Sequence, residues 1–324
     1  MSGCASENGL ANGAGLVGNS ANTCDGDMTS LPPIRSWLYA PGSSRRILDR
    51  VFGAGADAVI LDLEDSVRQE DKAAARRLVS TVLSRHVDAT LPVFVRINHP
   101  RMGMLAGDLA ASVGPGLMGL RVPKVEGGAE VRALEEVLRG AEDSAGIRAG
   151  RIVVVCGLES ARGVVLASEI ASSSQRVAAL SFGEVDYLAD VQGYPTPGRS
   201  ESLYARSQLV VSSRLAGIAP PVDSAYLEID DDDGLRRSCH DGKALGFSGR
   251  GAVHPRQVPI INREYTPSAD EVAAAQIVIA AASNASGAFR MPSGEFVDAA
   301  VIRRARSVVQ LADEIARRER ARQA

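Results

Sequence analysis

Several features that would indicate common functions are scarce or missing in this 324-residue sequence. Lys and Arg number 36 against 39 Asp and Glu, and the net charge is −3 at pH 7. The chain therefore lacks the basic excess that accompanies nucleic-acid binding. No apolar run approaches the roughly 18 residues that a membrane-spanning helix needs. We expect neither a nucleic-acid partner nor a membrane partner.

The cysteines give no sign of a disulfide framework or a zinc site. Cys4, Cys24, Cys156 and Cys239 show no paired spacing and no CxxC motif. This pattern favours a reducing compartment, and we expect a cytoplasmic protein. Cys156 lies within an apolar run, so we interpret it as a small core residue rather than a nucleophile.

The first 30 residues contain no Lys or Arg and are rich in Gly, Ala, Ser and Asn. A secretory signal needs a basic start and a continuous apolar stretch, and a transit peptide needs arginines. Neither is present in this segment. We predict that residues 1–30 form a disordered leader, or are upstream sequence before a start near Met28.

After Leu31 the sequence alternates regularly between short apolar runs and stretches of helical period. Runs that are apolar on both faces, such as AVILDLE and IVVVCGLE, suit a parallel sheet covered by helices. Eight such runs over roughly 200–250 residues predict a TIM (β/α)8 barrel, an α/β fold, which we assign to residues 31–264. An open doubly wound sheet shares this local pattern, but no GxGxxG follows the first strand. The eight predicted strands are residues 36–41, 57–64, 92–98, 119–124, 151–159, 177–183, 222–228 and 251–255; helices are predicted at 71–85, 129–139, 161–171 and 202–216.

The tail, residues 265–324, is longer than a barrel needs. TPSADEV, with Ser268 as N-cap, predicts the start of a helix. A polar loop follows at 283–295, and a final helix of mixed charge is predicted from about Val297. We predict an appended helical lid or an arm that contacts another subunit.

Charged residues stand at the ends of several predicted strands. In a TIM barrel these ends carry the catalytic groups, so the side chains should converge on one small space. Carboxylates packed together need a cation to offset their repulsion. A site of hard oxygen ligands favours Mg²⁺, with Mn²⁺ as a substitute. The strand-end residues are Asp62, Glu64, Asp65, Arg96, Asn98, Lys124, Glu159, Glu184, Asp186, His254 and Arg256.

An ordered set of motifs runs over residues 35–305: RSWLYAPGS, GADAVILDLEDSV, VRIN, VPKVE, LESARG, SFGEVDYLAD, LYARSQLVVSSRLAG, GFSGRGAVHPRQV, NREYTPSADEV and GEFVDAAVIRRA. A single motif would be weak evidence, but the ordered set is specific. With these motifs the chain resembles the citrate lyase β-subunit-like proteins of the HpcH/HpaI aldolase/citrate lyase superfamily, which include malyl-CoA and citramalyl-CoA lyases.

The resemblance implies a Mg²⁺-dependent barrel that acts on coenzyme A or acyl-carrier thioesters. It implies that Glu159 of LESARG and Asp186 of FGEVD bind the metal. Arg96 of VRIN matches the arginine that meets the thioester carbonyl or its enolate. Asp298 of GEFVD matches an aspartate that reaches into a neighbouring subunit and acts as the acid/base.

The remaining candidate residues have less specific roles. Asp62, Glu64 and Asp65 of LDLED match acidic residues that brace metal-bound water and neighbouring basic groups. Asp62 and Glu64 could equally anchor Arg96 or Lys124. Lys124 could be such a partner or touch the substrate. Arg45 and Arg46 follow PGSS in the first βα loop, where the resemblance implies contact with the nucleotide end of the thioester.

The resemblance implies reversible Claisen-type cleavage, and we predict a substrate such as malyl-CoA or citramalyl-CoA that is cleaved to acetyl-CoA and a 2-oxo acid, glyoxylate or pyruvate. Thioester hydrolysis, a citrate lyase β-subunit acting on acyl-carrier thioesters, and a non-catalytic subunit that binds CoA thioesters are the alternatives. The resemblance also implies a homotrimer, or a hexamer built from trimers, with a shared active site.

Two eye-catching features receive ordinary explanations. A lone strand-end histidine such as His254 is more often a hydrogen-bonded structural residue than a base. The acidic run at residues 230–233 precedes a helical stretch, so helix capping and compensation of the helix dipole are expected there.

Overall fold

The computed structural model describes residues 31–323 except 88–89, 284 and 286. The predicted leader, residues 1–30, lies outside the described residues. Among the described helices, none combines the length and the apolar character that crossing a membrane requires.

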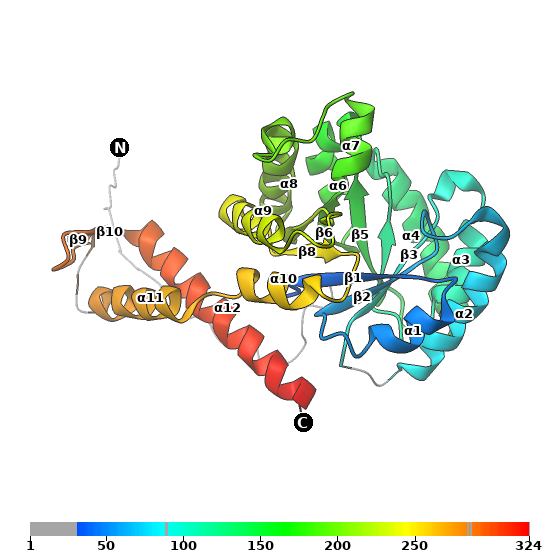
Figure 1. The fold of residues 1–324 in the computed structure, drawn as a ribbon, viewed down its shortest axis with the longest axis horizontal. Coiled ribbons are helices and arrows are strands. Elements are labelled where there is room, and N and C mark those ends of the chain that lie inside the picture. The colour runs from blue at the N-terminus through cyan, green and yellow to red at the C-terminus, as the bar shows by residue number, and fades with distance from the viewer. Residues whose placement is uncertain (1–30, 88–89, 284, 286, 324) are drawn as a thin grey trace, which may run out of the picture.

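Eight parallel strands close into a barrel in the order in which they occur along the chain (Figure 1). Closure is made by β1 against β8, where Ser36 pairs with Arg250 and Leu38 with Ala252. The predicted TIM barrel is confirmed, and the open sheet is excluded. The strands are β1 Ser36–Pro41, β2 Ala58–Asp62, β3 Val93–Arg96, β4 Gly119–Val122, β5 Val153–Leu158, β6 Val177–Phe182, β7 Ala219–Asp223 and β8 Gly249–Ala252.

Helices surround this barrel (Figure 1). The residues that follow each strand in sequence form them, as the alternating pattern predicts. They are α1 Arg45–Val51, α2 Lys72–Arg85, α3 Leu105–Ser112, α4 Gly128–Ser144, α5 Ala161–Val165, α6 Ala167–Ala171, α7 Glu184–Asp190, α8 Leu203–Ala216, α9 Asp232–Leu245 and α10 Gln257–Tyr265; short 3-10 turns lie at Gln69–Asp71, Pro100–Met102 and Ser200–Ser202.

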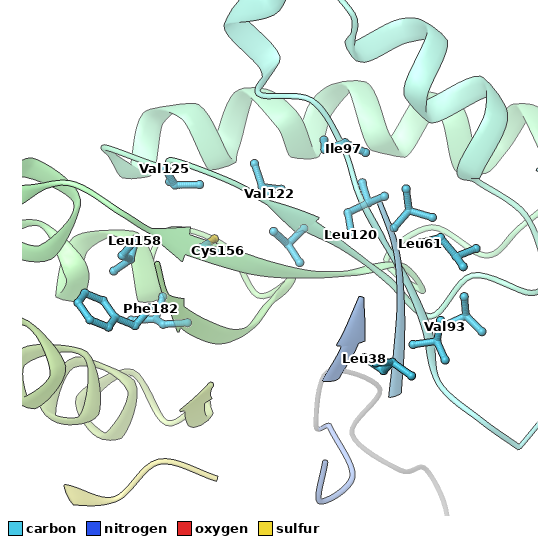
Figure 2. Close-up of a cluster of buried hydrophobic side chains, with 14 of the residues drawn as sticks. Leu38, Leu61, Val93, Ile97, Leu120, Val122, Val125, Cys156, Leu158 and Phe182 are labelled. Atoms are coloured by element: carbon cyan, nitrogen blue, oxygen red, sulfur yellow. The ribbon is translucent and has the colours of Figure 1, made fainter. Parts of the chain in front are cut away.

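The strands bury side chains on both faces, which explains their apolar runs. Leu61, Leu120 and Cys156 belong to the larger cluster, which lies between the strands and the helices (Figure 2). The smaller cluster fills the barrel interior, where the rings of Trp37 and Phe94 lie 4.7 Å apart. Beyond this apolar plug, toward the carboxyl ends of the strands, the inward-facing side chains are polar and form a polar layer.

Several predicted elements differ from the structure in their bounds or continuity, and three differences are informative. The seventh strand is Ala219–Asp223 rather than residues 222–228. Pro220 and Pro221 argue against a strand because they lack N–H groups, but the carbonyl oxygen of Pro221 still accepts the amide of Ser248 at 3.1 Å. The helix predicted at 161–171 is interrupted at Leu166, whose φ of −92° and ψ of 11° separate α5 from α6. The eighth strand starts and ends earlier than predicted, at Gly249–Ala252.

The tail forms a helical arm on one side of the barrel (Figure 1). It consists of α11 Ala269–Ala282, a hairpin of β9 Phe289–Arg290 with β10 Phe296–Val297, and α12 Ala299–Gln323. Ser268 caps α11 in a full capping box with Glu271, as predicted. The far end of α12 returns to the barrel, where Arg322 Nη1 lies 2.9 Å from Asp57 Oδ1.

Candidate active site

A cavity of about 300 Å³ opens at the carboxyl ends of the strands. Five of the strand-end residues predicted from the sequence line it: Asp62, Arg96, Glu159, Glu184 and Asp186. They come from β2, from β3, from the residue after β5 and from the first turn of α7. The barrel thus brings together groups that lie up to about 120 residues apart in sequence, as strand-end convergence requires.

Asp62 holds Arg96 through two hydrogen bonds. Arg96 Nε donates to Asp62 Oδ1 at 2.7 Å, and Nη2 donates to Oδ2 at 2.6 Å. Burial alone would raise the pKa of Asp62, but the hydrogen bonds from Arg96 outweigh it and hold this pKa below its usual range. The same pair raises the pKa of Arg96 against the effect of burial. Arg96 is therefore a fixed cation at the cavity wall.

Glu64 and Lys124 extend this pair toward Asp186. Glu64 Oε2 lies 2.9 Å from Arg96 Nη1, and Lys124 Nζ donates to Glu64 Oε1 at 3.0 Å. Lys124 Nζ also lies 3.1 Å from Asp65 Oδ2 and 3.7 Å from Asp186 Oδ1. Lys124 adopts a left-handed backbone conformation, with φ of 53°. Such backbone strain persists where surrounding contacts hold a residue in place, so Lys124 has a fixed position at the mouth of the barrel.

Glu159 is buried without a close partner. Its carboxylate receives no hydrogen bond from any residue that the structure describes, and its nearest cation, Arg121 Nη2, is 3.8 Å away. Burial raises the pKa of Glu159, and the charges of Glu64 and Asp186 raise it further, while Arg121 opposes them. A carboxylate in this position is stabilised by an additional cation.

Two glycines leave the space that the Glu159 side chain fills. A Cβ on Gly183 would lie 2.5 Å from Glu159 Cγ, and one on Gly157 would lie 2.5 Å from Glu159 Oε1. Distances below 3.0 Å are not tolerated without movement. Gly183 and Gly157 therefore set the position of this carboxylate.

The donor set suits a magnesium ion. Within the described part of the chain, no group of three or more His, Cys, Asp or Glu is clustered as a metal cage. Mg²⁺ does not need one, because it keeps several waters and binds through one or two carboxylates and substrate oxygens. Glu159 lacks a hydrogen-bond donor, and the half-exposed Asp186 is near enough for its charge to raise the pKa of Glu159. These two residues fit the ion.

Arg121 lies beside Arg96 and was missed in the sequence. The two residues are paired in register on β4 and β3, and both line the cavity. Arg121 Nε donates to Tyr39 Oη at 2.5 Å, and Nη1 donates to Ser181 Oγ. Its position within the apolar strand GLRV was a signal, because a cation in a fully buried strand has only the polar end of the barrel in which to lie.

A second buried charge cluster supports the far wall of the cavity. Asp223, at the end of β7, accepts hydrogen bonds from Arg199, Arg206 and Arg250 at 2.9 to 3.1 Å. Burial alone would raise the pKa of Asp223, but the three guanidinium groups lower it strongly. Arg199 also donates to Glu184 at 2.8 to 3.1 Å, and so ties the start of α7 to β7. None of these ion pairs was predicted from the sequence pattern.

Residues 35–255 match the family described as HpcH/HpaI aldolase/citrate lyase. The chain belongs to the HpcH/HpaI aldolase/citrate lyase family. Its relatives in this family are named as lyases, which agrees with the prediction that this chain is a carbon–carbon lyase.

Two curated relatives are similar over nearly their whole length. The citrate lyase subunit beta of Leuconostoc mesenteroides subsp. cremoris is 34% identical over 283 residues, covering 86% of this chain and 93% of that protein. The L-malyl-CoA/beta-methylmalyl-CoA lyase of Cereibacter sphaeroides is 32% identical over 306 residues, covering 87% and 96%. Among solved structures, CitE from Mycobacterium tuberculosis in complex with magnesium, acetoacetate and coenzyme A has a TM-score of 0.70 and 29% identity, covering 88% of this chain and 99% of that one.

Five of the residues given a role in catalysis or substrate binding do not line the cavity. Glu64 and Lys124 contact the lining residues Arg96 and Asp186, whereas Arg45, Arg46 and Asp298 lie apart from it. Arg45 and Arg46 are exposed at the start of α1, and Arg45 Nε lies 3.7 Å from Asp49. Asp298 lies between the β9–β10 hairpin and α12, at the end of the arm away from the barrel (Figure 1). There Asp298 Oδ1 accepts the amides of Ala300 and Val301 at 2.8 and 3.0 Å, which lowers its pKa.

The ordinary explanations for the other features agree with the structure. His254 is exposed, and its Nδ1 accepts the amide of Arg256 at 3.3 Å. Asp231 caps α9 by accepting the amide of Gly234 at 2.8 Å. Cys156 is fully buried in β5, where burial raises the pKa of its thiol to about 12. A thiol with this pKa is not a nucleophile at neutral pH.

Proposed function

We propose that this chain catalyses the Mg²⁺-dependent, reversible cleavage of a 3-hydroxyacyl-CoA of the malyl-CoA or citramalyl-CoA type. The products are acetyl-CoA and a 2-oxo acid, glyoxylate or pyruvate. One observation carries the proposal: a buried carboxylate without a hydrogen-bond donor, Glu159, shares a small cavity with a fixed guanidinium, Arg96. The names of the two lyase relatives and the magnesium and coenzyme A bound by the Mycobacterium tuberculosis protein support it.

Glu159 and Asp186 would hold the metal in this reaction. When bound there, Mg²⁺ supplies Lewis acidity to the carboxylate and the neighbouring oxygen of the substrate. Glu159 is the more constrained of the two, because Gly157 and Gly183 fix its position. Asp186 stands in the first turn of α7, whose start is tied to β7 through Glu184.

Arg96 would bind the thioester oxygen. In cleavage, the hydroxyl of the substrate loses its proton, the carbon–carbon bond breaks, and the electron pair moves onto the thioester as an enolate. A proton then adds to the CH2 carbon of this enolate to give the methyl carbon of the acetyl group. A guanidinium that Asp62 already holds in place stabilises the enolate without reorganising. Glu64 contacts Nη1 of Arg96 and is itself held by Lys124, so the orientation of Arg96 is set by Asp62 and by Glu64.

Asp298 would move the proton, but in a neighbouring subunit. It is on the arm and is not among the residues that line the cavity of its own chain. A site shared between subunits of a homotrimer or hexamer would bring such an arm to a second cavity. Asp298 accepts two amides, so its carboxylate is already oriented. Arg45 and Arg46, exposed beside the first βα loop, would meet the nucleotide end of coenzyme A.

A direct test is product analysis. The full-length protein is incubated with malyl-CoA and citramalyl-CoA, with Mg²⁺ or with EDTA, and the products are identified by mass spectrometry. We expect acetyl-CoA with glyoxylate or pyruvate, only with Mg²⁺. Glu159→Ala should abolish turnover, whereas Asp143→Asn, an exposed carboxylate on α4, should leave it unchanged. Free CoA without acetyl-CoA would instead identify a thioesterase, and turnover only with acyl-carrier thioesters would identify a citrate lyase β-subunit.

The shared site has its own test. Glu159→Ala and Asp298→Asn variants are each expected to be inactive alone, because one lacks the metal ligand and the other the proton carrier. Co-expression in mixed oligomers should restore part of the activity, since some cavities then receive both intact residues. If mixed oligomers form and stay as inactive as either variant, Asp298 does not serve a neighbouring cavity.

A further inference from the structure

Arg121 is a buried cation in the cavity without a carboxylate at hydrogen-bonding distance among the described residues. Arg121 is 6% exposed, and its guanidinium donates hydrogen bonds to two neutral hydroxyl groups, those of Tyr39 and Ser181. The nearest carboxylate oxygen, Glu159 Oε1, is 3.8 Å from Nη2. Burying a guanidinium is unfavourable unless a charged partner compensates for its lost hydration.

The charges around the cavity leave Arg121 without a partner once a metal is bound. Asp62 pairs with Arg96, and both Glu64 and Asp65 pair with Lys124. Glu159 and Asp186 together carry two negative charges, which a divalent cation neutralises. Among the described residues, no other carboxylate lies at hydrogen-bonding distance from the Arg121 guanidinium.

The position of Arg121 relative to Arg96 is also informative. The two residues are register partners on adjacent strands, so their side chains point into the same end of the barrel. The ring of Tyr39 lies near both guanidinium groups, with its centroid 5.1 Å from the guanidinium carbon of Arg96 and 5.9 Å from that of Arg121. A substrate that meets Arg96 with its thioester oxygen therefore has a second fixed cation within reach.

We infer that Arg121 binds a second carboxylate of the substrate and selects an acyl group that carries one. This inference rests on the proposed function. In malyl-CoA and citramalyl-CoA the carbon that bears the hydroxyl and the chelating carboxylate also bears a hydrogen or a methyl group. Arg121 favours a carboxymethyl group at that position, as in citryl-CoA. The cleavage reaction is the one proposed above, but the preferred 2-oxo acid product is then a dicarboxylate rather than glyoxylate or pyruvate. The hydroxyls of Tyr39 and Ser181 hold the guanidinium in place for it.

The test is an equilibrium measurement that needs no turnover. Malate and lactate both chelate Mg²⁺ through a carboxylate and a hydroxyl, and they differ by the carboxymethyl and methyl groups in question. Their dissociation constants are measured by calorimetry with saturating Mg²⁺ on wild type and Arg121→Met. We expect wild type to favour malate by at least about tenfold, the typical strength of a hydrogen bond to a charged group. Arg121→Met should remove most of this preference and leave lactate binding nearly unchanged.

Controls separate this role from a structural one. The ratio of the two constants within one variant does not depend on the fraction of folded protein. Arg176→Met removes another buried guanidinium, which pairs with Glu142 outside the cavity, and should leave the ratio at its wild-type value. In turnover, Arg121→Met should lower kcat/KM for citryl-CoA relative to citramalyl-CoA by a similar factor.

Two results would overturn the inference. Wild type could bind both acids equally, or Arg121→Met could weaken both by the same factor, which would mean that Arg121 contacts the chelating carboxylate or serves only the fold. Failure of the proposed function looks different. In that case wild type cleaves no thioester, yet its preference for malate and the dependence of that preference on Arg121 persist.

Discussion

Gly183→Ala tests whether the position of Glu159 determines metal affinity. The new Cβ would lie 2.5, 2.8 and 3.1 Å from three carbon atoms of Glu159, its three nearest neighbours. Ordinary contact begins at 3.4 Å, so the Glu159 side chain must retreat by roughly 1 Å. The backbone tolerates alanine, since Gly183 has φ of −113° and ψ of 84°. The cost therefore comes from this contact alone.

The expected loss is about 10- to 100-fold in Mg²⁺ affinity, the range typical for displacing a metal ligand through its neighbour. Calorimetric titration with Mg²⁺ measures it. Gly140→Ala in α4 is the matched control, because a Cβ there meets nothing within 4 Å. That variant should bind Mg²⁺ like wild type and be slightly more stable, since alanine favours a helix.

A double-mutant cycle identifies the contact. In EDTA, Gly183→Ala should lower the free energy of unfolding by about 1–3 kcal/mol, as overpacking does. In a Glu159→Ala background two of the three contacting carbons are gone, so most of this cost should disappear. An equal cost in both backgrounds, or unchanged Mg²⁺ affinity in Gly183→Ala, would refute this account of Glu159.

Three further predictions concern the same site. Arg96→Lys loses the paired hydrogen bonds to Asp62, so kcat should fall by about 100-fold, with unchanged Mg²⁺ affinity by titration. Burial, reinforced by nearby carboxylates, raises the pKa of Glu159 in the folded protein, so the folded state binds this proton more tightly than the unfolded chain. The stability of the metal-free protein therefore falls as the pH rises from the ordinary Glu range through the raised pKa. Glu159→Gln should raise Tm in EDTA more at about pH 8 than at about pH 5. An equal gain in Tm at both pH values would contradict a raised pKa of Glu159. Asp298→Asn should keep Tm, because asparagine also caps helices, while turnover is lost; a large drop in Tm would show that the cap, not the acid, was essential.

The predictable part of the site follows from strand periodicity. Asp62, Arg96 and Glu159 each end an apolar run, and the carboxyl ends of barrel strands meet at one mouth whatever the details of packing. Their convergence could therefore be predicted without coordinates. The same reasoning fails for β7, where Pro220 and Pro221 resemble a strand break although their carbonyl groups still serve the barrel.

The part of the site that the sequence did not predict depends on how the barrel closes. Arg121 lies inside a strand, and the sequence does not say whether an inward position falls in the apolar plug or in the polar layer above it. Asp223 binds Arg199, Arg206 and Arg250 from a loop, a helix and a strand. These pairings are specified only when β7, β8 and α8 are in register around the barrel. Periodicity carries no information about them.

Because Glu159 and Arg121 lie close together, metal binding should be coupled to substrate binding. Without a metal, Arg121 is the nearest cation to Glu159, at 3.8 Å, and it opposes the rise in the pKa of that carboxylate. Once a divalent cation neutralises Glu159, this attraction weakens and the guanidinium is available to a substrate carboxylate. Thermodynamic linkage then requires that the substrate raise metal affinity by the same factor. Malate should therefore strengthen Mg²⁺ binding more than lactate does in wild type, and equally in Arg121→Met. If Mg²⁺ titrations show the same enhancement by both acids in wild type, Glu159 and Arg121 act independently.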